Sequence, residues 1–397
     1  MRNREEGRAI MKKIVTLSLL GAGVLLQADM SQQEFLYKDP RMMGMGAAAT
    51  AVGGYSTAVF YNPAGLINIK KSHGAEVELL GISVTGSKKI RTFADDIKNA
   101  NTDTEMTDVL SKYSGKAFNA TVANYSSFSY HTQSDFAYSV GILVSADANF
   151  IPHANTGTSG LLETHSRGYG GVVLGAAQKY DDTLGGTLTV GIGAKYITQK
   201  SYEAGIDAGD VLKHKDDLGT YLQDNYEVKN SGFGVDVGLL YEPGILASLH
   251  PSVGLSVMNI GTLNFDNAYG AQPMTLNGGL SIAPDVPLFD SFVLSLDYID
   301  MLNAQQARVN HDGKYQNADI DFDMMQHLRA GLKAGLFDNS WVTTTLMAGW
   351  YQGAYTAGVD FQLAILKIQA ATYQEQMGAK IGQLEDRRYI VGLGIGW

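Results

Sequence analysis

The 397-residue sequence contains no cysteine, little proline (8 residues) and no visible basic patch. Without cysteine, the chain can form neither a disulfide framework nor a thiolate metal site. This absence suits a protein that crosses an oxidising periplasm before it folds. The formal net charge of −10 argues against direct contact with nucleic acid, because phosphate recognition needs clustered lysine and arginine.

The sequence also lacks a hydrophobic run that could form a transmembrane helix. Its one strongly apolar segment, residues 14–26, is shorter than the ~20 residues that span a bilayer. Two lysines precede this segment and Ala28 follows it, which is the order of a secretory signal peptide. We expect residues 1–28 to be a cleavable signal peptide with an N-terminal extension, its natural start being Met11; a buried core helix is the alternative. If the mature chain spans a membrane, it would then have to form a closed β-barrel, whose backbone satisfies its own hydrogen bonds in lipid.

Glycine (46 residues) and tyrosine (21 residues) are abundant instead. From residue 75 onward the chain repeats alternating stretches of about ten residues separated by turns, the pattern of transmembrane barrels. In residues 188–196, for example, apolar side chains alternate with threonine, glycine and lysine. Successive side chains of a strand point to opposite faces, so one face would suit lipid and the other a lumen. A soluble sandwich also alternates, but its polar face seldom uses so much glycine.

This pattern predicts an all-β fold: an antiparallel transmembrane β-barrel of about 14 strands over residues 75–397. The odd-numbered connections are long and the even-numbered ones short, as expected for a barrel with both termini on the periplasmic side. Residues 242–250 and 352–353 are the two exceptions. The expected strands span residues 75–85, 119–131, 135–147, 166–180, 186–202, 229–242, 251–260, 273–283, 290–300, 327–336, 340–350, 354–363, 365–375 and 388–397.

The last expected strand has an apolar face opposite a face of glycines. That apolar face consists of Tyr389, Val391, Leu393, Ile395 and Trp397. A terminal aromatic residue on such a face resembles the C-terminal signal that the outer-membrane barrel-assembly machinery recognises. We therefore expect these five residues to act as that signal and to face outer-membrane lipids. An edge strand of a soluble β-protein is the alternative.

Residues 29–74 do not read as strands. They are rich in glycine and alanine, so their backbone can pack closely against another surface. A barrel of this size would be an open channel unless its lumen were filled, and we expect this segment to fold inside as a plug. Asn62 and Pro63 favour a turn, while Gly44 and Gly46 would allow a tight backbone path. A short periplasmic linker is the alternative.

Two motifs in this segment resemble the hatch of a known family. Arg41-Met-Met-Gly-Met-Gly and Tyr61-Asn-Pro-Ala-Gly-Leu resemble the hatch of the FadL/TodX outer-membrane transport superfamily, whose fourteen-stranded barrel holds an Asn-Pro-Ala plug. From residue 357 onward the chain resembles a branch labelled conjugal-transfer TraF-like, which is related to PorV-type secretion barrels. By this resemblance the plug motif comprises Gly44, Gly46, Asn62, Pro63, Ala64 and Gly65.

The resemblance implies a monomeric channel in the outer membrane of a Gram-negative bacterium that takes up small hydrophobic molecules. Channels of this family release substrate sideways through a gap in the wall. Ser145 and Asp147 end the third expected strand and would form such a gap, unless the strand has already left the membrane there. The rival hypothesis is a non-conducting barrel that anchors secretion or conjugation proteins through its long loops.

The long connections carry apolar stripes and acidic clusters. Residues 91–113 look helical, and their apolar residues would either pack together or bind ligand. The aspartates of residues 207–227 fit a solvated loop better than a calcium site, because their spacing matches no EF-hand. The sequence shows no metal-binding histidine pair, dinucleotide loop or nucleophile elbow. We therefore expect no metal site, no cofactor, no catalytic residue and no enzymatic activity.

Overall fold

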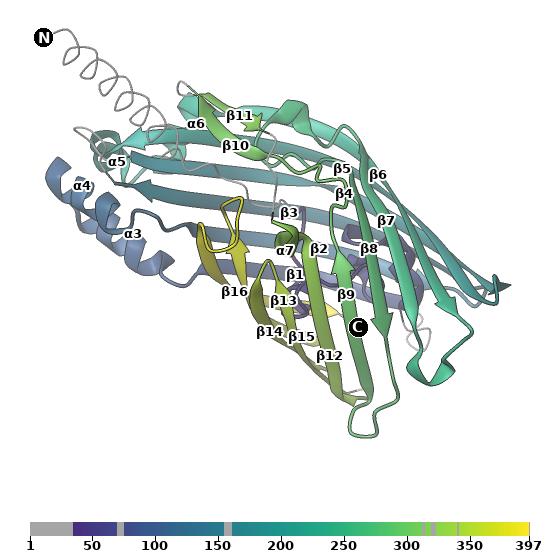
Figure 1. The fold of residues 1–397 in the computed structure, drawn as a ribbon. Helices are drawn as coiled ribbons and strands as arrows, with labels where there is room; N and C mark the ends of the chain where they lie inside the picture. The colour runs from purple at the N-terminus through teal and green to yellow at the C-terminus, as the bar shows by residue number, and fades with distance from the viewer. Residues whose placement is uncertain are drawn as a thin grey trace, which may run out of the picture.

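The computed structural model describes residues 35–69, 75–154, 161–311, 314–318, 323–339 and 341–396. Within them, fourteen antiparallel strands close into a barrel (Figure 1), which confirms the predicted fold class. Neighbouring strands follow the order of the chain, and β1 pairs with β16 to close the barrel. The barrel strands are β1 Ala75–Ser87, β2 Phe118–His131, β3 Phe136–His153, β4 Leu161–Thr183, β5 Gly186–Asp207, β6 Val228–Pro243, β7 Ser252–Gly261, β8 Thr275–Ile282, β9 Ser291–Tyr298, β12 Leu328–Asp338, β13 Val342–Tyr351, β14 Ala354–Leu363, β15 Leu366–Gln376 and β16 Glu385–Gly396.

Three strands are longer than predicted at the end of the barrel that carries the long connections, here called the loop end. The expected limits at residues 147, 166 and 202 are wrong, because β3 reaches His153, β4 starts at Leu161 and β5 ends at Asp207. The apolar alternation stops earlier, but the ladders continue, with His153 opposite Leu161 and Leu161 opposite Asp207. These strands exceed the roughly 9–11 residues that cross a bilayer and project beyond the apolar band.

The outer surface of the barrel is an apolar band. On β3, Ile142 and Val144 are each 58% exposed, whereas Leu143 between them is fully buried and faces the lumen. Tyr180, Tyr196 and Trp350 are exposed, as expected for aromatic residues at a lipid interface. Tyr373, which also lies near a strand end, is 1% exposed and points inward. None of the helices in the described part of the chain is long and apolar enough to cross a membrane.

Residues 35–69 lie inside the barrel. The segment forms α2 (Pro40–Gly44), η2 (Ser56–Phe60) and η3 (Pro63–Asn68). Helix α2 contacts β13 to β16, η2 contacts β2 and β4, and η3 contacts β3 to β6. A segment that touches strands on opposite sides of a closed barrel occupies its lumen, and we call residues 35–69 the plug.

Glycines of the wall provide the space into which the plug fits. A Cβ atom added at Gly191 would lie 2.2 Å from the backbone nitrogen of Ala64. At Gly238 it would lie 1.9 Å from Oδ1 of Asn62. Either contact is too short for any side chain. The glycine face that the sequence shows along the strands is therefore the surface on which the plug backbone rests.

The connections at the loop end form a helical layer of their own (Figure 1). Its buried apolar residues include Met106 and Leu110, and Phe93 stacks on Phe118 with ring centroids 4.4 Å apart. Of the two alternatives, these stripes therefore pack together. The connections at the loop end contain α3 Ile90–Asn99, α4 Asp103–Lys112, α5 Ala208–His214, α6 Leu218–Tyr226, η6 Phe265–Asn267, β10 Ala307–His311, β11 Lys314–Ala318 and α7 Met324–His327, whereas η5 Ala247–Leu249 lies between β6 and β7 at the other end.

An ion pair joins the first two of these helices. Lys112 donates to the carboxylate of Asp96 at 2.6 Å, and this bond holds the pKa of Asp96 below its ordinary value. The strands β10 and β11 form a hairpin within the long connection of residues 301–326.

The seating of the plug predicts different effects for two glycines of the wall. We expect Gly191→Val to displace the plug from the wall and to lower the free energy of unfolding by about 1–3 kcal/mol, the usual cost of overpacking. Gly168→Val is the matched control, because a Cβ at Gly168 meets nothing within 4 Å. Thermal unfolding in detergent and protease cleavage within residues 35–69 would measure the effect, and heat-modifiable gel migration would confirm that both barrels fold. Equal protease resistance of both variants would contradict this seating.

Candidate functional site

Asn62 fastens the plug at three points. Its side chain is buried, and Oδ1 accepts a hydrogen bond from the backbone nitrogen of Ala64 at 3.0 Å. Nδ2 donates to the carbonyl of Thr50 at 2.7 Å and to that of Leu239, on β6, at 3.1 Å. Asn62 has extended backbone angles and Pro63 begins η3, which is the local geometry that an Asn-Pro pair favours. Asn62 thus joins its own turn, a second turn of the plug and the wall.

The other residues of the plug motif make close backbone contacts. Gly46 has φ +66°, and a Cβ there would lie 2.5 Å from carbonyl oxygens of β12 and β13. At Gly44 it would lie 3.0 Å from the Cα of Gly358. Gly65 packs against another turn of the plug, and Ala64 is fully buried. None of the six motif residues lines the cavities described below, so their positions indicate a structural role.

A buried ion pair that the sequence analysis missed organises the start of the plug. Asp39 caps α2, and its Oδ2 accepts hydrogen bonds from Arg41 at 2.7 Å and from Thr57 at 2.5 Å. The guanidinium of Arg41 lies over the ring of Tyr55 at 4.0 Å. The Asp-Pro pair at residues 39–40 is a helix-start signal that could have predicted the cap. Nothing in the local sequence indicates that Thr57 bonds to Asp39.

The expected assembly signal faces outward where it is described. Tyr389, Val391, Leu393 and Ile395 are 47%, 47%, 54% and 39% exposed. Trp397 lies outside the described residues. Recognition of this face by the assembly machinery stays a prediction.

Ser145 and Asp147 face the lumen from the middle of a continuous strand. Ser145 is buried, and Asp147 forms a 2.7 Å ion pair with Arg167 on the neighbouring strand β4. Strand β3 pairs with β2 and β4 through these positions, so a lateral opening here stays a prediction that the pairing does not support. The wall is irregular in β1, whose register shifts against both neighbours between Glu78 and Ile82.

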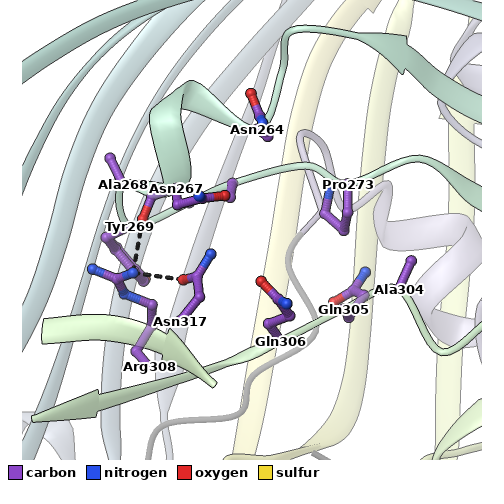
Figure 2. Close-up of a pocket in the computed structure, with 12 residues that line it drawn as sticks. Asn264, Asn267, Ala268, Tyr269, Pro273, Ala304, Gln305, Gln306, Arg308 and Asn317 are labelled. Atoms are coloured by element: carbon purple, nitrogen blue, oxygen red, sulfur yellow. Dashed lines mark hydrogen bonds between the residues drawn. The ribbon is translucent and has the colours of Figure 1, made fainter. Parts of the chain in front are cut away.

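The described residues line, among others, one cavity at the loop end and two cavities beside the plug. The mouth cavity lies at the loop end between the β7–β8 connection and the chain around β10, and it holds about 510 Å³ of empty space, part of it open to solvent (Figure 2). The inner cavity of about 490 Å³ and the side cavity of about 440 Å³ both contact residues 35–37 of the plug. Phe35, Leu36 and Tyr37 line both of these cavities, and Gln305 lines both the mouth cavity and the inner cavity. The cavities therefore follow one another from the loop end into the lumen.

The inner cavity is lined by both apolar and polar side chains. Phe35, Tyr37 and Phe60 of the plug contribute aromatic rings. The rest of the lining contributes Met258, Ile299, several amides and Lys195, whose ammonium lies 2.9 Å from the carboxylate of Asp236. A bound molecule would therefore meet aromatic rings as well as paired polar groups.

The β10–β11 hairpin is fastened beside the mouth cavity by Arg308. The Nε of Arg308 donates to Glu203 on β5 at 2.8 Å. Its Nη1 donates to the carbonyl of Asn267 at 2.8 Å and to Oδ1 of Asn317 at 2.6 Å (Figure 2). Glu203 also contacts Nδ1 of the buried His165 at 3.0 Å. These partners are far apart in sequence, so no local pattern predicts them. In the described residues, no group of three or more histidine, aspartate or glutamate side chains is placed to hold a metal ion.

Several solved barrels share this architecture. The Ralstonia pickettii toluene transporter TbuX is 14% identical, covers 91% of this chain and 98% of its own, and superposes with a TM-score of 0.52. The chain shares its fold. The monoaromatic hydrocarbon channel CymD is 12% identical, with 90% and 96% of the two chains covered and a TM-score of 0.51. A TodX deletion mutant is 11% identical, with 89% and 98% covered and a TM-score of 0.51. No family model matches the sequence, and a search of curated proteins finds no match to it.

The hydrogen bonds of Asn62 predict a loss of stability when its side chain is removed. We expect Asn62→Ala to lower the free energy of unfolding by about 1–3 kcal/mol, since it removes a cap and leaves two buried carbonyls without their donor. Asn225→Ala is the control, because Asn225 is exposed on α6. Denaturant unfolding in detergent would compare the two variants. A stability for Asn62→Ala equal to that of the control would contradict the fastening role.

Proposed function

We propose that the chain is an outer-membrane channel of the FadL type that takes up small hydrophobic molecules and conducts them past a plug that stays in place. The observation that carries this proposal is the series of three cavities, which starts at the loop end and continues around residues 35–37. The names of the solved barrels with this fold, a toluene transporter and monoaromatic hydrocarbon channels, support the same solute class.

The proposed membrane orientation follows from the outer surface and the connections. Apolar side chains cover the outside of the strands, as lipid requires. Long connections gather at one end and short turns at the other, so the loop end would face the outside of the cell and the turns the periplasm. Export through a signal peptide in residues 1–28 belongs to this proposal, and those residues lie outside the described part of the chain.

The inner cavity is smaller than a site that holds one aromatic ring. A dry protein cavity of roughly 150 Å³ holds benzene. The comparable volume of the inner cavity is about 50 Å³. A single-ring solute would therefore displace side chains of the cavity lining as it passes the plug.

A scaffold in a secretion or conjugation apparatus is the second candidate function. The helices α3 to α6 and the extended ends of β3 to β5 form a packed layer beyond the apolar band, which offers a surface for a protein partner (Figure 1). A stable partner after cross-linking, together with no copurified small molecule, would favour this candidate. The TraF-like and PorV-related assignment belongs to the same alternative.

Uptake of toluene tests the channel proposal. Gram-negative cells that express the protein should accumulate radiolabelled toluene faster than cells without it, because lipopolysaccharide slows hydrophobic solutes at the outer leaflet. Leu36→Trp should bring uptake close to background, since Leu36 lines both the inner and the side cavity and a larger side chain would fill them. Val140→Trp on the lipid face is the control and should leave uptake unchanged. Uptake by Leu36→Trp cells at the unmodified rate would contradict this route.

A further inference from the structure

The mouth cavity is lined by an unusual number of side-chain amides. Apart from Arg308 and Tyr269, its side chains are these amides, three alanines and a proline, so a large apolar surface is missing from its lining. An apolar solute would displace water from these amides and would not replace the hydrogen bonds that the water makes, which is unfavourable. The amides are those of Asn264, Asn267, Gln305, Gln306 and Asn317, and Figure 2 shows them around one space.

The cations of the mouth and inner cavities are neutralised by the protein. Arg308 in the mouth cavity pairs with Glu203 at 2.8 Å, and Lys195 in the inner cavity pairs with Asp236 at 2.9 Å. No carboxylate is among the side chains that line these two cavities in the described part of the chain. Each cation that an anion could pair with is already paired, and a cation would have no carboxylate to pair with. These two cavities are therefore suited to an uncharged molecule.

The amides of the inner cavity are held in place and keep hydrogen-bonding capacity. Asn277 donates to Ser256 at 3.3 Å and accepts from the backbone of Asp300 at 2.8 Å. The Oδ1 of Asn259 accepts from Lys195 at 2.7 Å. A side-chain amide offers two donors and two acceptor positions, so each can bind one group more. These fixed amides line the same cavity as the aromatic rings of the plug.

We infer that the channel, if it conducts aromatic solutes as proposed above, selects uncharged aromatic molecules that carry a hydroxyl group, the class of phenol, over plain hydrocarbons. The ring of such a solute packs against Phe35, Tyr37 and Phe60, while its hydroxyl bonds to the amides of the wall. A phenolic hydroxyl is uncharged at neutral pH, because its pKa is about 10. Gln305 lines both cavities and is the specificity-determining residue, since a solute passes its amide on the way in.

Uptake of a matched series tests this inference. Toluene, phenol and benzoate differ at one substituent, and each rate is measured in cells with and without the protein. We expect phenol to exceed toluene by roughly two- to tenfold, the factor that one net hydrogen bond supplies, and benzoate to stay at background. Gln305→Leu should remove most of the preference for phenol over toluene. Gln316→Leu is the control, because Gln316 is exposed on the β10–β11 hairpin and lines none of the three cavities.

The outcomes separate this inference from the proposed function. Toluene entering as fast as phenol would overturn the selectivity and leave the channel intact. Benzoate entering at the rate of phenol would overturn the requirement for an uncharged solute. Entry of neither phenol nor toluene above background would overturn the channel itself. An unchanged preference in Gln305→Leu cells, with the variant barrel folded, would remove Gln305 from its role.

Discussion

The rest of this structure depends on direct contact between the backbone of the plug and glycines of the barrel wall. At Gly254 a Cβ would lie 2.2 Å from the carbonyl oxygen of Thr50, and at Gly331 it would lie 2.5 Å from that of Met45. Side chains at these positions would hold the plug away from the wall. The inner face of the strands therefore has to be bare where the plug rests, while the outer face has to be apolar for lipid.

Hydrogen bonds also hold the plug against the wall. Asp297 on β9 accepts a 2.7 Å hydrogen bond from the backbone nitrogen of Thr50, and Asn62 bonds to β6, three strands further along the wall. Buried polar groups stabilise a structure only when they are satisfied, so such bonds favour one position of the plug over others. With the plug fixed, the space left for a solute is the series of cavities beside it. The channel proposal and the preference for hydroxylated rings both follow from the lining of that space.

The parts of the fold that the sequence predicted are those set by local patterns. Strand number follows from the two-residue alternation, and the turn at Asn62 and Pro63 follows from the restriction that proline places on its neighbour. Beyond the apolar band the outward residues are alanines on β3 and glycine, serine, threonine and lysine on β4 and β5, so the strongly apolar alternation that marks a strand weakens although pairing continues.

The candidate site was harder to predict because distant residues build it. Arg308 pairs with Glu203 only in the closed barrel. Gln305 likewise lines the cavity beside residues 35–37 only in the folded protein. Sequence patterns report neighbours along a strand or helix, whereas cavities depend on what several connections leave unfilled. The Asn-Pro-Ala motif led correctly to the plug, but its side chains line none of the three cavities.

The central claim is that the plug stays in contact with the glycines of the barrel wall while solute passes, and thiol labelling tests this claim most directly. Because the chain has no cysteine, a single introduced cysteine is the one thiol of the protein that a maleimide can label. Val59 is fully buried in η2 and packs against Gly175 of β4, whereas Ser134 lies exposed in a turn. During solute uptake, a water-soluble maleimide should label Ser134→Cys quickly and leave Val59→Cys unmodified until the protein is unfolded. Labelling of Val59→Cys that accelerates with uptake would show that the plug leaves its seat and would contradict this account.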